Sequence, residues 1–181
     1  MSQVSWRSFK KLDLLPETWN STISQSCTID NAILYKVLLR TGRFLTHVDF
    51  SDFADNLDEN AVHSVAMYCP NLQNIDVTDL TTSSSNIETL AQKCTKIISF
   101  SLGHCKKTKK SYDKALSKLF AQNKNLKYIK FFGSLINGRC IQSINVDNLE
   151  EIVLEGCNHI DPGHFFQVKS FLSISYTLHK L

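Results

Sequence analysis

The stretch CPNLQNIDVTD, residues 69–79, places Leu72, Ile75 and Val77 in an LxxLxL arrangement behind a Cys-Pro-Asn lead-in. Apolar residues at the first, fourth and sixth positions recur elsewhere in the chain. The copies are FKKLDL at 9–14, LTHVDF at 45–50, LQNIDV at 72–77, IISFSL at 97–102, LKYIKF at 126–131, LEEIVL at 149–154 and, more weakly, FLSISY at 171–176. Because six clear coincidences are improbable, the pattern predicts a repeated strand.

The intervals between the copies fit one class of repeat. From Leu45 onward, consecutive copies begin 27, 25, 29, 23 and 22 residues apart. Leucine-rich repeats are roughly 20–29 residues long. Only the first interval, 36 residues from Phe9 to Leu45, is long enough to hold an insertion.

Helical signals fill the intervals between the strand copies. Residues 30–42 offer Asp30 as the N-cap and Gly42 just past the end, and residues 58–70 offer Asp58 as the N-cap and Pro70 as the stop. Two more helices are predicted in residues 84–94 and 112–123. The side chains expected to face inward are Ile33, Leu34, Val37, Leu38, Ala61, Val62, Val65, Ala66, Ile87, Leu90, Ala115, Leu116 and Leu119.

This alternation of strand, turn, helix and return predicts an α/β fold. The specific expectation is a leucine-rich-repeat solenoid of about six to seven repeats, an open arc with parallel strands on the concave face and helices on the convex face. A single domain over residues 1–181 is expected. It comprises a first strand and N-terminal connection in 1–29, well-marked repeats in 30–161 and a C-terminal repeat or cap in 162–181.

Four of the six cysteines stand in register with the repeat. Cys69 and Cys94 each precede a strand copy by three residues, and Cys105 and Cys157 each follow one by three. This recurrence predicts small buried packing residues, and we expect thiols without a disulfide. A zinc site is the alternative, because potential ligands also cluster in the sequence: Cys157, His159 and His164, and the neighbours His104 and Cys105.

The repeat sequences resemble a known family. LDENAVHSVAMYCPNLQNIDVTD, CTKIISFSLGHCKK and LEEIVLEGCNHID are similar to the cysteine-containing leucine-rich repeats of F-box/LRR proteins, and the resemblance covers residues 30–161. The opening VSWRSFKKLDL is similar to the segment that follows the F-box in this family. The resemblance implies a protein-binding module that recognises the substrate of an SCF (Skp-cullin-F-box) ubiquitin ligase and so serves ubiquitin-dependent protein degradation.

The F-box itself is not among these residues. Only five residues precede Trp6, whereas the family's F-box is a three-helix unit. We therefore expect that this chain, as given, does not bind the Skp adaptor by itself. The adaptor and the cullin would be partners only of a longer form that carries an F-box.

Candidate binding residues occupy the strand positions that point away from the ladder, which are the third, the fifth and the one after the motif. In the early strands they are acidic, in the middle strand they are small, and later Tyr128 and Phe132 flank Lys130. Aromatics beside a cation are enriched in interface hot spots. The alternatives are an ordinary solvated sheet, or a C-terminal segment, residues 170–181, that folds back over the aromatic patch. The candidates are His47, Asp49, Asn74, Asp76, Tyr128, Lys130, Phe132, Glu151 and Val153.

Charge is concentrated in two runs. Residues 106–130 hold nine lysines and one acidic residue, Asp113. A basic cluster can bind phosphate backbones or acidic proteins, or direct nuclear import. The second functional hypothesis is therefore a stand-alone repeat scaffold that binds an acidic protein or RNA through this flank; a solvated loop is the simplest reading. The acidic run in residues 49–59 lacks the spacing of an EF-hand. It is expected to cap a helix and to increase the solubility of the protein. The candidate basic patch is Lys106, Lys107, Lys109, Lys110 and Lys114.

Catalytic and membrane classes find no support in the sequence. It contains no Gly-rich phosphate loop, no GxSxG and no HExxH. No window approaches the roughly 18 continuous apolar residues of a membrane-spanning helix. We expect a non-catalytic monomer in the cytoplasm or the nucleus, with no cofactor and no metal.

Overall fold

The computed structural model describes residues 10–13, 29–50, 56–103, 111–133, 136–165 and 173–177. The strands are β1 (Lys11–Asp13), β2 (His47–Asp49), β3 (Asn74–Val77), β4 (Ser99–Leu102), β5 (Tyr128–Phe132), β6 (Glu151–Glu155) and β7 (Ser173–Thr177). The α-helices are α2 (Asn31–Thr41), α3 (Asn60–Tyr68), α4 (Ser84–Lys93) and α5 (Asp113–Gln122). The short 3-10 helices are η2 (Gly42–Phe44), η3 (Arg139–Ser143), η4 (Val146–Asn148) and η5 (Pro162–Phe165).

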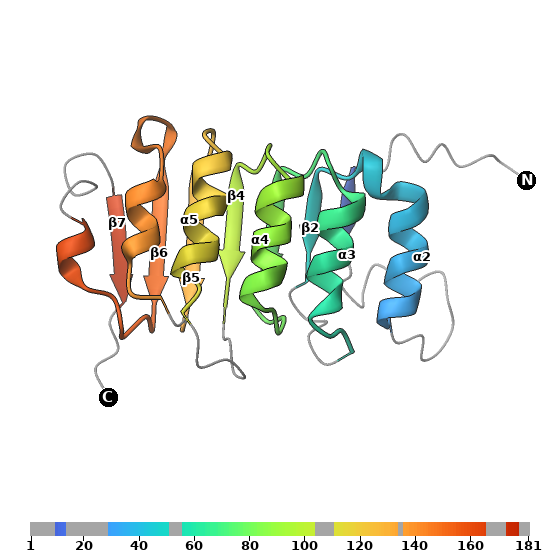
Figure 1. Cartoon of the computed structure of the whole chain (residues 1–181), viewed down its shortest axis with the longest axis horizontal. Helices are drawn as coiled ribbons and strands as arrows, with labels where there is room; N and C mark the ends of the chain where they lie inside the picture. Colours follow the sequence, from blue (N-terminus) through green and yellow to red (C-terminus); the bar gives the residue numbers. More distant parts are fainter. Residues whose placement is uncertain are drawn as a thin grey trace, which may run out of the picture.

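The strands form one parallel sheet in the order of the sequence, from β1 to β7. Each strand pairs in parallel with the next, so the predicted α/β fold and parallel pairing are confirmed. Figure 1 shows helices α2 to α5 side by side along one face of this sheet. A parallel pair needs a crossover between its strands, and here the helical segments supply it.

The register of the sheet follows the LxxLxL pattern. The fourth position of each copy is paired with the fourth position of the next, through Leu12, Val48, Ile75, Phe100, Ile129, Ile152 and Ile174. From Leu12 to Ile152 these side chains are at most 2% exposed. Because side chains alternate between the two faces of a strand, the sixth position shares their face. Full burial of one such side chain contributes about 1.5–3 kcal/mol.

The core between sheet and helices is one continuous apolar cluster. Its centre holds Phe100 of β4, Phe120 of α5 and Phe131 of β5, whose ring centroids lie 6.3–6.5 Å apart. The predicted inward residues of α3, α4 and α5 are all buried. In α2 the prediction was wrong for Ile33, which is 37% exposed, and Val37 is only partly buried.

Helix α2 begins and ends at the predicted residues, with Asp30 before its first residue and Gly42 after its last. The Asp30 Oδ1 accepts a hydrogen bond from the Ile33 N–H at 2.8 Å, which is N-cap geometry. Gly42, however, is right-handed (φ −52°) and continues into η2, so it is not a left-handed stop. Its small size is needed because a Cβ there would lie 2.6 Å from the Tyr68 carbonyl oxygen.

The start of α3 differs from the prediction. The helix begins at Asn60 and its N-cap position is Glu59, whose side chain makes no capping bond. Asp58, the predicted cap, still accepts from the Asn60 N–H at 2.8 Å. Its carboxylate thus satisfies one of the free N–H groups at the helix start from one position further out.

The described cysteines are buried thiols: Cys69, Cys94, Cys140 and Cys157. Burial raises the pKa of Cys69 and of Cys94 to about 12. The Cys94 thiol lies 3.4 Å from the Cys69 carbonyl oxygen, as expected of stacked positions in register. Cys27 and Cys105 lie outside the described residues.

Asp113 links the start of α5 to residues 137–140, which follow β5. This buried carboxylate accepts from the backbone N–H groups of Asn137 at 2.8 Å and Cys140 at 3.1 Å, and from the Ser111 hydroxyl. Burial opposes its ionisation, but the hydrogen bonds from Ser111, Asn137 and Cys140 outweigh it and lower the pKa. The connection from β5 to β6 carries 3-10 helices instead of an α-helix.

The C-terminal strand extends the sheet. Residues 173–177 form β7 beside β6, with Ser173 paired to Glu151 and Tyr176 to Leu154. The alternative in which this segment folds back over the aromatic patch is therefore wrong for residues 173–177. No helix among the described residues is long and apolar enough to cross a membrane.

Candidate functional site

The sheet face that points away from the core carries two rows of side chains. One row runs His47, Asn74, Ser99, Tyr128, Glu151, and the other runs Asp49, Asp76, Ser101, Lys130, Val153. We call this surface the open face, because the described helices lie on the opposite side of the sheet (Figure 1). Adjacent members of a row stand about 4.8 Å apart. The register brings the predicted candidates together on one surface.

The early half of the open face is acidic. Asp49 and Asp76 are paired residues of β2 and β3 and both are partly exposed. The Asp76 Oδ1 accepts from the Thr78 N–H at 2.9 Å, so one carboxylate oxygen turns toward the end of its own strand. In the neighbouring row, His47 Nδ1 lies 2.8 Å from the Thr46 hydroxyl.

Small residues form the middle of the open face. Ser101 is 5% exposed although it belongs to the outward row. At Gly103 a Cβ would lie 1.8 Å from the Thr78 carbonyl oxygen. The backbone segments after β3 and β4 can therefore approach this closely only because residue 103 is glycine. Strand β4 therefore presents only short side chains on the open face, between the acidic strands β2 and β3 and the aromatic strand β5.

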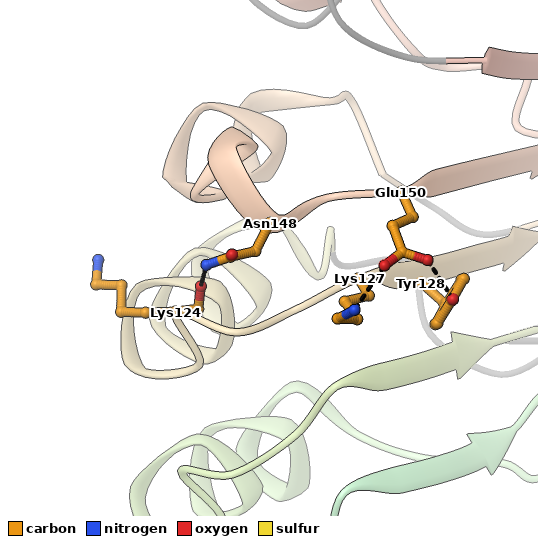
Figure 2. A network of polar contacts seen from close by, with 5 residues as sticks. All are labelled: Lys124, Lys127, Tyr128, Asn148 and Glu150. Atoms are coloured by element: carbon orange, nitrogen blue, oxygen red, sulfur yellow. Dashed lines mark hydrogen bonds and ion pairs between the residues drawn. The ribbon is translucent and has the colours of Figure 1, made fainter.

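Tyr128 anchors the later half of the open face. Its hydroxyl donates to one oxygen of Glu150, and the other oxygen lies 2.6 Å from the Lys127 ammonium group. Figure 2 shows the two donors converging on the one carboxylate, while Asn148 donates to the Lys124 carbonyl at 3.2 Å. The aromatic ring is thus oriented by charge and not left free, and it is 36% exposed.

The hydrogen bonds among Lys127, Tyr128 and Glu150 shift the pKa of each group toward the protonation state that preserves them. Hydrogen bonds from Lys127 and then from Tyr128 lower the pKa of Glu150. The bond to Glu150 raises the pKa of Lys127 and of Tyr128. All three groups face solvent, so salt screens their interaction and its effect on folding stability is small.

The remaining predicted residues of this half are partly covered. Lys130, Phe132, Glu151 and Val153 are all intermediate in exposure. Phe132 of β5 pairs with Glu155 of β6. Lys130 makes no ion pair with any residue that the structure describes. A cation flanked by a tyrosine and a phenylalanine is therefore present on the open face, as expected, and Phe132 is the more buried of the two rings.

Most of the candidate basic patch lies outside the described residues, namely Lys106, Lys107, Lys109 and Lys110. Lys114 is exposed on α5, on the helical side of the sheet. Two other lysines of the run are paired, Lys118 with Glu88 at 3.1 Å and Lys127 with Glu150. The described part of the lysine run is therefore divided, with Lys114 and Lys118 on α5 and Lys130 on the open face.

Metal-binding clusters are absent from the part of the chain that the structure describes: no three His, Cys, Asp or Glu side chains converge there. Cys157 is buried, whereas His159 is exposed. His164 is half-buried, with its Nδ1 3.2 Å from the Gln142 Nε2. The two remaining potential ligands of the zinc alternative, His104 and Cys105, lie outside the described residues.

Glu150 is the site residue that the sequence analysis missed. It occupies the second position of its strand copy, and Lys127 occupies the same position one copy earlier. The backbone N–H of Glu150 donates to the Lys127 carbonyl at 2.9 Å, which places these positions side by side. Opposite charges at equivalent positions of adjacent repeats were the sequence signal that could have identified Glu150.

No protein-family model matches this chain.

Proposed function

We propose that this chain is a leucine-rich-repeat solenoid that binds a protein through its open face, in the manner of the substrate-recognition part of an SCF ubiquitin ligase. The sequence resemblance to F-box/LRR repeats supplies the ligase context. The proposed role is that of a non-catalytic receptor, so any ubiquitin transfer would belong to the assembled complex.

The observation that carries the proposal is the composition of the open face. A sheet covered by helices on one side only has a second face that is available to solvent or to a partner. Here that face places carboxylates on β2 and β3, small residues on β4, and Tyr128 and Lys130 on β5 in register. Such a surface can discriminate partners by charge at two separate points.

The geometry also favours recognition of a protein over recognition of a small molecule. The candidate residues are spread over five adjacent strands, β2 to β6, about 4.8 Å apart. They therefore extend over roughly 19 Å, which suits a segment of a protein partner. Tyrosine beside a cation is the composition that interface anchors favour.

The test compares proximity labelling by the full chain with labelling by an open-face variant, Asp76→Lys with Lys130→Glu. The matched control is His63→Ala, an exposed position on α3. We expect a set of proteins whose labelling is lost in the open-face variant and retained in the control. Identical labelling by all three proteins would reject the open face as the binding site.

The ligase context needs its own readout. For a protein identified in this way, removal of the chain from cells should lengthen the partner's half-life, and a proteasome inhibitor should cancel the difference. Co-purification of the Skp adaptor and cullin with this chain, and with any longer transcript product, completes the test. An unchanged half-life together with loss of binding in the open-face variant would leave a binding scaffold without ligase recruitment.

A further inference from the structure

Exposed large apolar side chains gather on the first two described helices. Ile33, Tyr35 and Leu39 of α2 and Met67 of α3 are 37%, 43%, 53% and 47% exposed. Among the described residues, the corresponding surfaces of α4 and α5 expose no large apolar side chain. The repeat architecture therefore does not require these exposed side chains. Leu39 and Met67 line one groove between the two helices, and contiguous exposed apolar surface marks interaction sites.

A groove of about 510 Å³ lies between the C-terminal parts of α2 and α3. The groove is largely open to solvent, and its volume falls within the range of ligand-binding clefts. One wall is stiffened by an edge-to-face contact between Tyr35 and Tyr68, whose ring centroids are 5.5 Å apart and whose hydroxyls are 3.4 Å apart. The groove is lined by Leu38, Leu39, Arg40, Arg43, Met67, Tyr68 and Pro70.

Two arginines give this groove, whose lining is partly polar and partly apolar, a positive charge. Arg40 and Arg43 are exposed, and neither forms an ion pair with any residue that the structure describes. Arg43 lines the groove, and its guanidinium lies 4.6 Å from the centre of the Phe44 ring, within the range of a cation–π contact. A guanidinium held in this way is suited to bidentate recognition of a carboxylate.

We propose that this groove binds a short acidic and apolar segment of a partner protein. A large apolar side chain of the segment enters between Leu39 and Met67, and a neighbouring carboxylate pairs with Arg40 or Arg43. This site lies on the helical side of the sheet, so it is separate from the open face and does not depend on the function proposed for it.

Charge complementarity selects this occupant over residues 1–9 of the chain and over a second copy. Residues 1–9 contain Arg7 and no Asp or Glu, so they offer no carboxylate to the two arginines. A second copy of the chain brings a net charge of +3 to a surface that is already cationic. An acidic partner removes this repulsion and pairs both guanidinium groups.

The test selects a random displayed peptide library against the full chain. We expect enriched peptides that combine a carboxylate with a large apolar residue within a few positions. Arg40→Glu with Arg43→Glu, and separately Met67→Asp, should weaken their binding roughly tenfold or more. Lys93→Glu is the matched control, because Lys93 occupies the last turn of α4 as Arg40 occupies the last turn of α2. Peptides with Lys in place of the carboxylate should recover binding to the double arginine variant.

Each other outcome overturns the proposal. Absence of enrichment, enriched peptides without carboxylates, or equal binding to the wild type and the groove variants would show that the groove does not recognise this chemistry. A dimer that Met67→Asp dissociates would assign the groove to self-association. Enrichment only after Trp6→Ser would assign it to residues 1–9 of the same chain. Circular dichroism on every variant shows whether a loss of binding reflects a loss of fold.

Discussion

The backbone N–H of Ile97 donates to the Asn123 Oδ1 at 2.7 Å, so the lead-in to β4 is held by the residue that ends α5. The Asn123 Nδ2 in turn donates to the Leu119 carbonyl at 2.9 Å. Asn123 is 1% exposed and occupies the position that Cys69 and Cys94 occupy in the preceding repeats, three residues before a strand copy. One amide side chain thus joins two repeats from within the core.

Asn123→Ala should lower the free energy of unfolding by about 1–3 kcal/mol, because it leaves the Ile97 N–H buried without an acceptor. Urea unfolding monitored by circular dichroism measures the change. Gln122→Ala, one residue earlier on an exposed position of α5, is the control and should change stability by less than about 0.5 kcal/mol. Equal effects of the two substitutions would contradict the role of the Asn123 amide.

Ile75→Asp should be severely destabilising, by roughly 4 kcal/mol or more, because it places an unpaired carboxylate in the apolar ladder. Asp76→Ala, on the opposite face of the same strand, removes only the bond from the Thr78 N–H and should cost about 0.5–1.5 kcal/mol. Thermal melts of both variants provide the comparison. Shifts of equal size would mean that the inside and outside assignments of β3 are wrong.

Asp113→Asn should reduce stability at neutral pH, because a neutral amide cannot replace the carboxylate that accepts from Asn137, Cys140 and Ser111. The folded-state pKa of Asp113 lies below its ordinary value. Ionised Asp113 therefore stabilises the fold above the unfolded-state pKa, and this contribution is lost as the pH falls through the folded-state pKa.

Wild type and Asp113→Asn should accordingly differ most near pH 7 and converge below about pH 4. Urea unfolding at a series of pH values measures the difference. Asp147→Asn, at an exposed position of η4, serves as the control for general carboxylate effects. A gap between wild type and Asp113→Asn that stays constant from pH 7 to pH 3 would contradict the electrostatic account.

Tyr128→Ala combined with Phe132→Ala should abolish capture of partners at the open face. Both rings are only partly buried, so the expected loss of stability is modest, about 1–2 kcal/mol, against about 3–5 kcal/mol for the buried neighbour Phe131→Ala. Proximity labelling and a thermal melt on the same preparations separate the two effects. A loss of stability as large as that of Phe131→Ala would show that the two rings belong to the core.

The thiols of Cys69 and Cys94 should resist maleimide at pH 8 in the folded protein, because burial raises the pKa of each to about 12 and the thiolate is the reactive form. Both should react after denaturation in guanidinium. Mass spectrometry of the labelled peptides distinguishes them from the other cysteines. Rapid labelling of either residue in the native protein would place it outside the core.

The strands and their register were predictable from the sequence because they depend on local pattern. Side chains alternate along a strand, so the positions of Ile75 and Phe100 in LxxLxL already determine which side faces the helices. Parallel stacking then follows from repetition, since every copy has the same apolar side to bury. The same reasoning identified the helices and the open face with Asp76, Tyr128 and Lys130.

Residues that link repeats were not predictable in this way. Asn123, Asp113 and Glu150 are polar, and the residues adjacent to each in the sequence do not distinguish a buried or paired side chain from a solvated one. For Glu150 the only signal is a comparison between repeats, which sets it at the same position as Lys127. Their partners are Ile97, Asn137 and Tyr128, which are 22 to 26 residues distant in the chain. Which donor meets which acceptor depends on the stacking offset of neighbouring repeats.

The width of the buried face of each helix was decided by tertiary packing for a related reason. Ile33 and Leu34 are adjacent apolar residues of α2, yet only Leu34 is buried. A helical periodicity of apolar residues locates the middle of the buried stripe, whereas the width of that stripe depends on how closely the neighbouring helix approaches. The sequence by itself therefore determined the strands, their register and the inward faces. The groove between α2 and α3 and the bonds between repeats arose only from the packing of whole segments against one another.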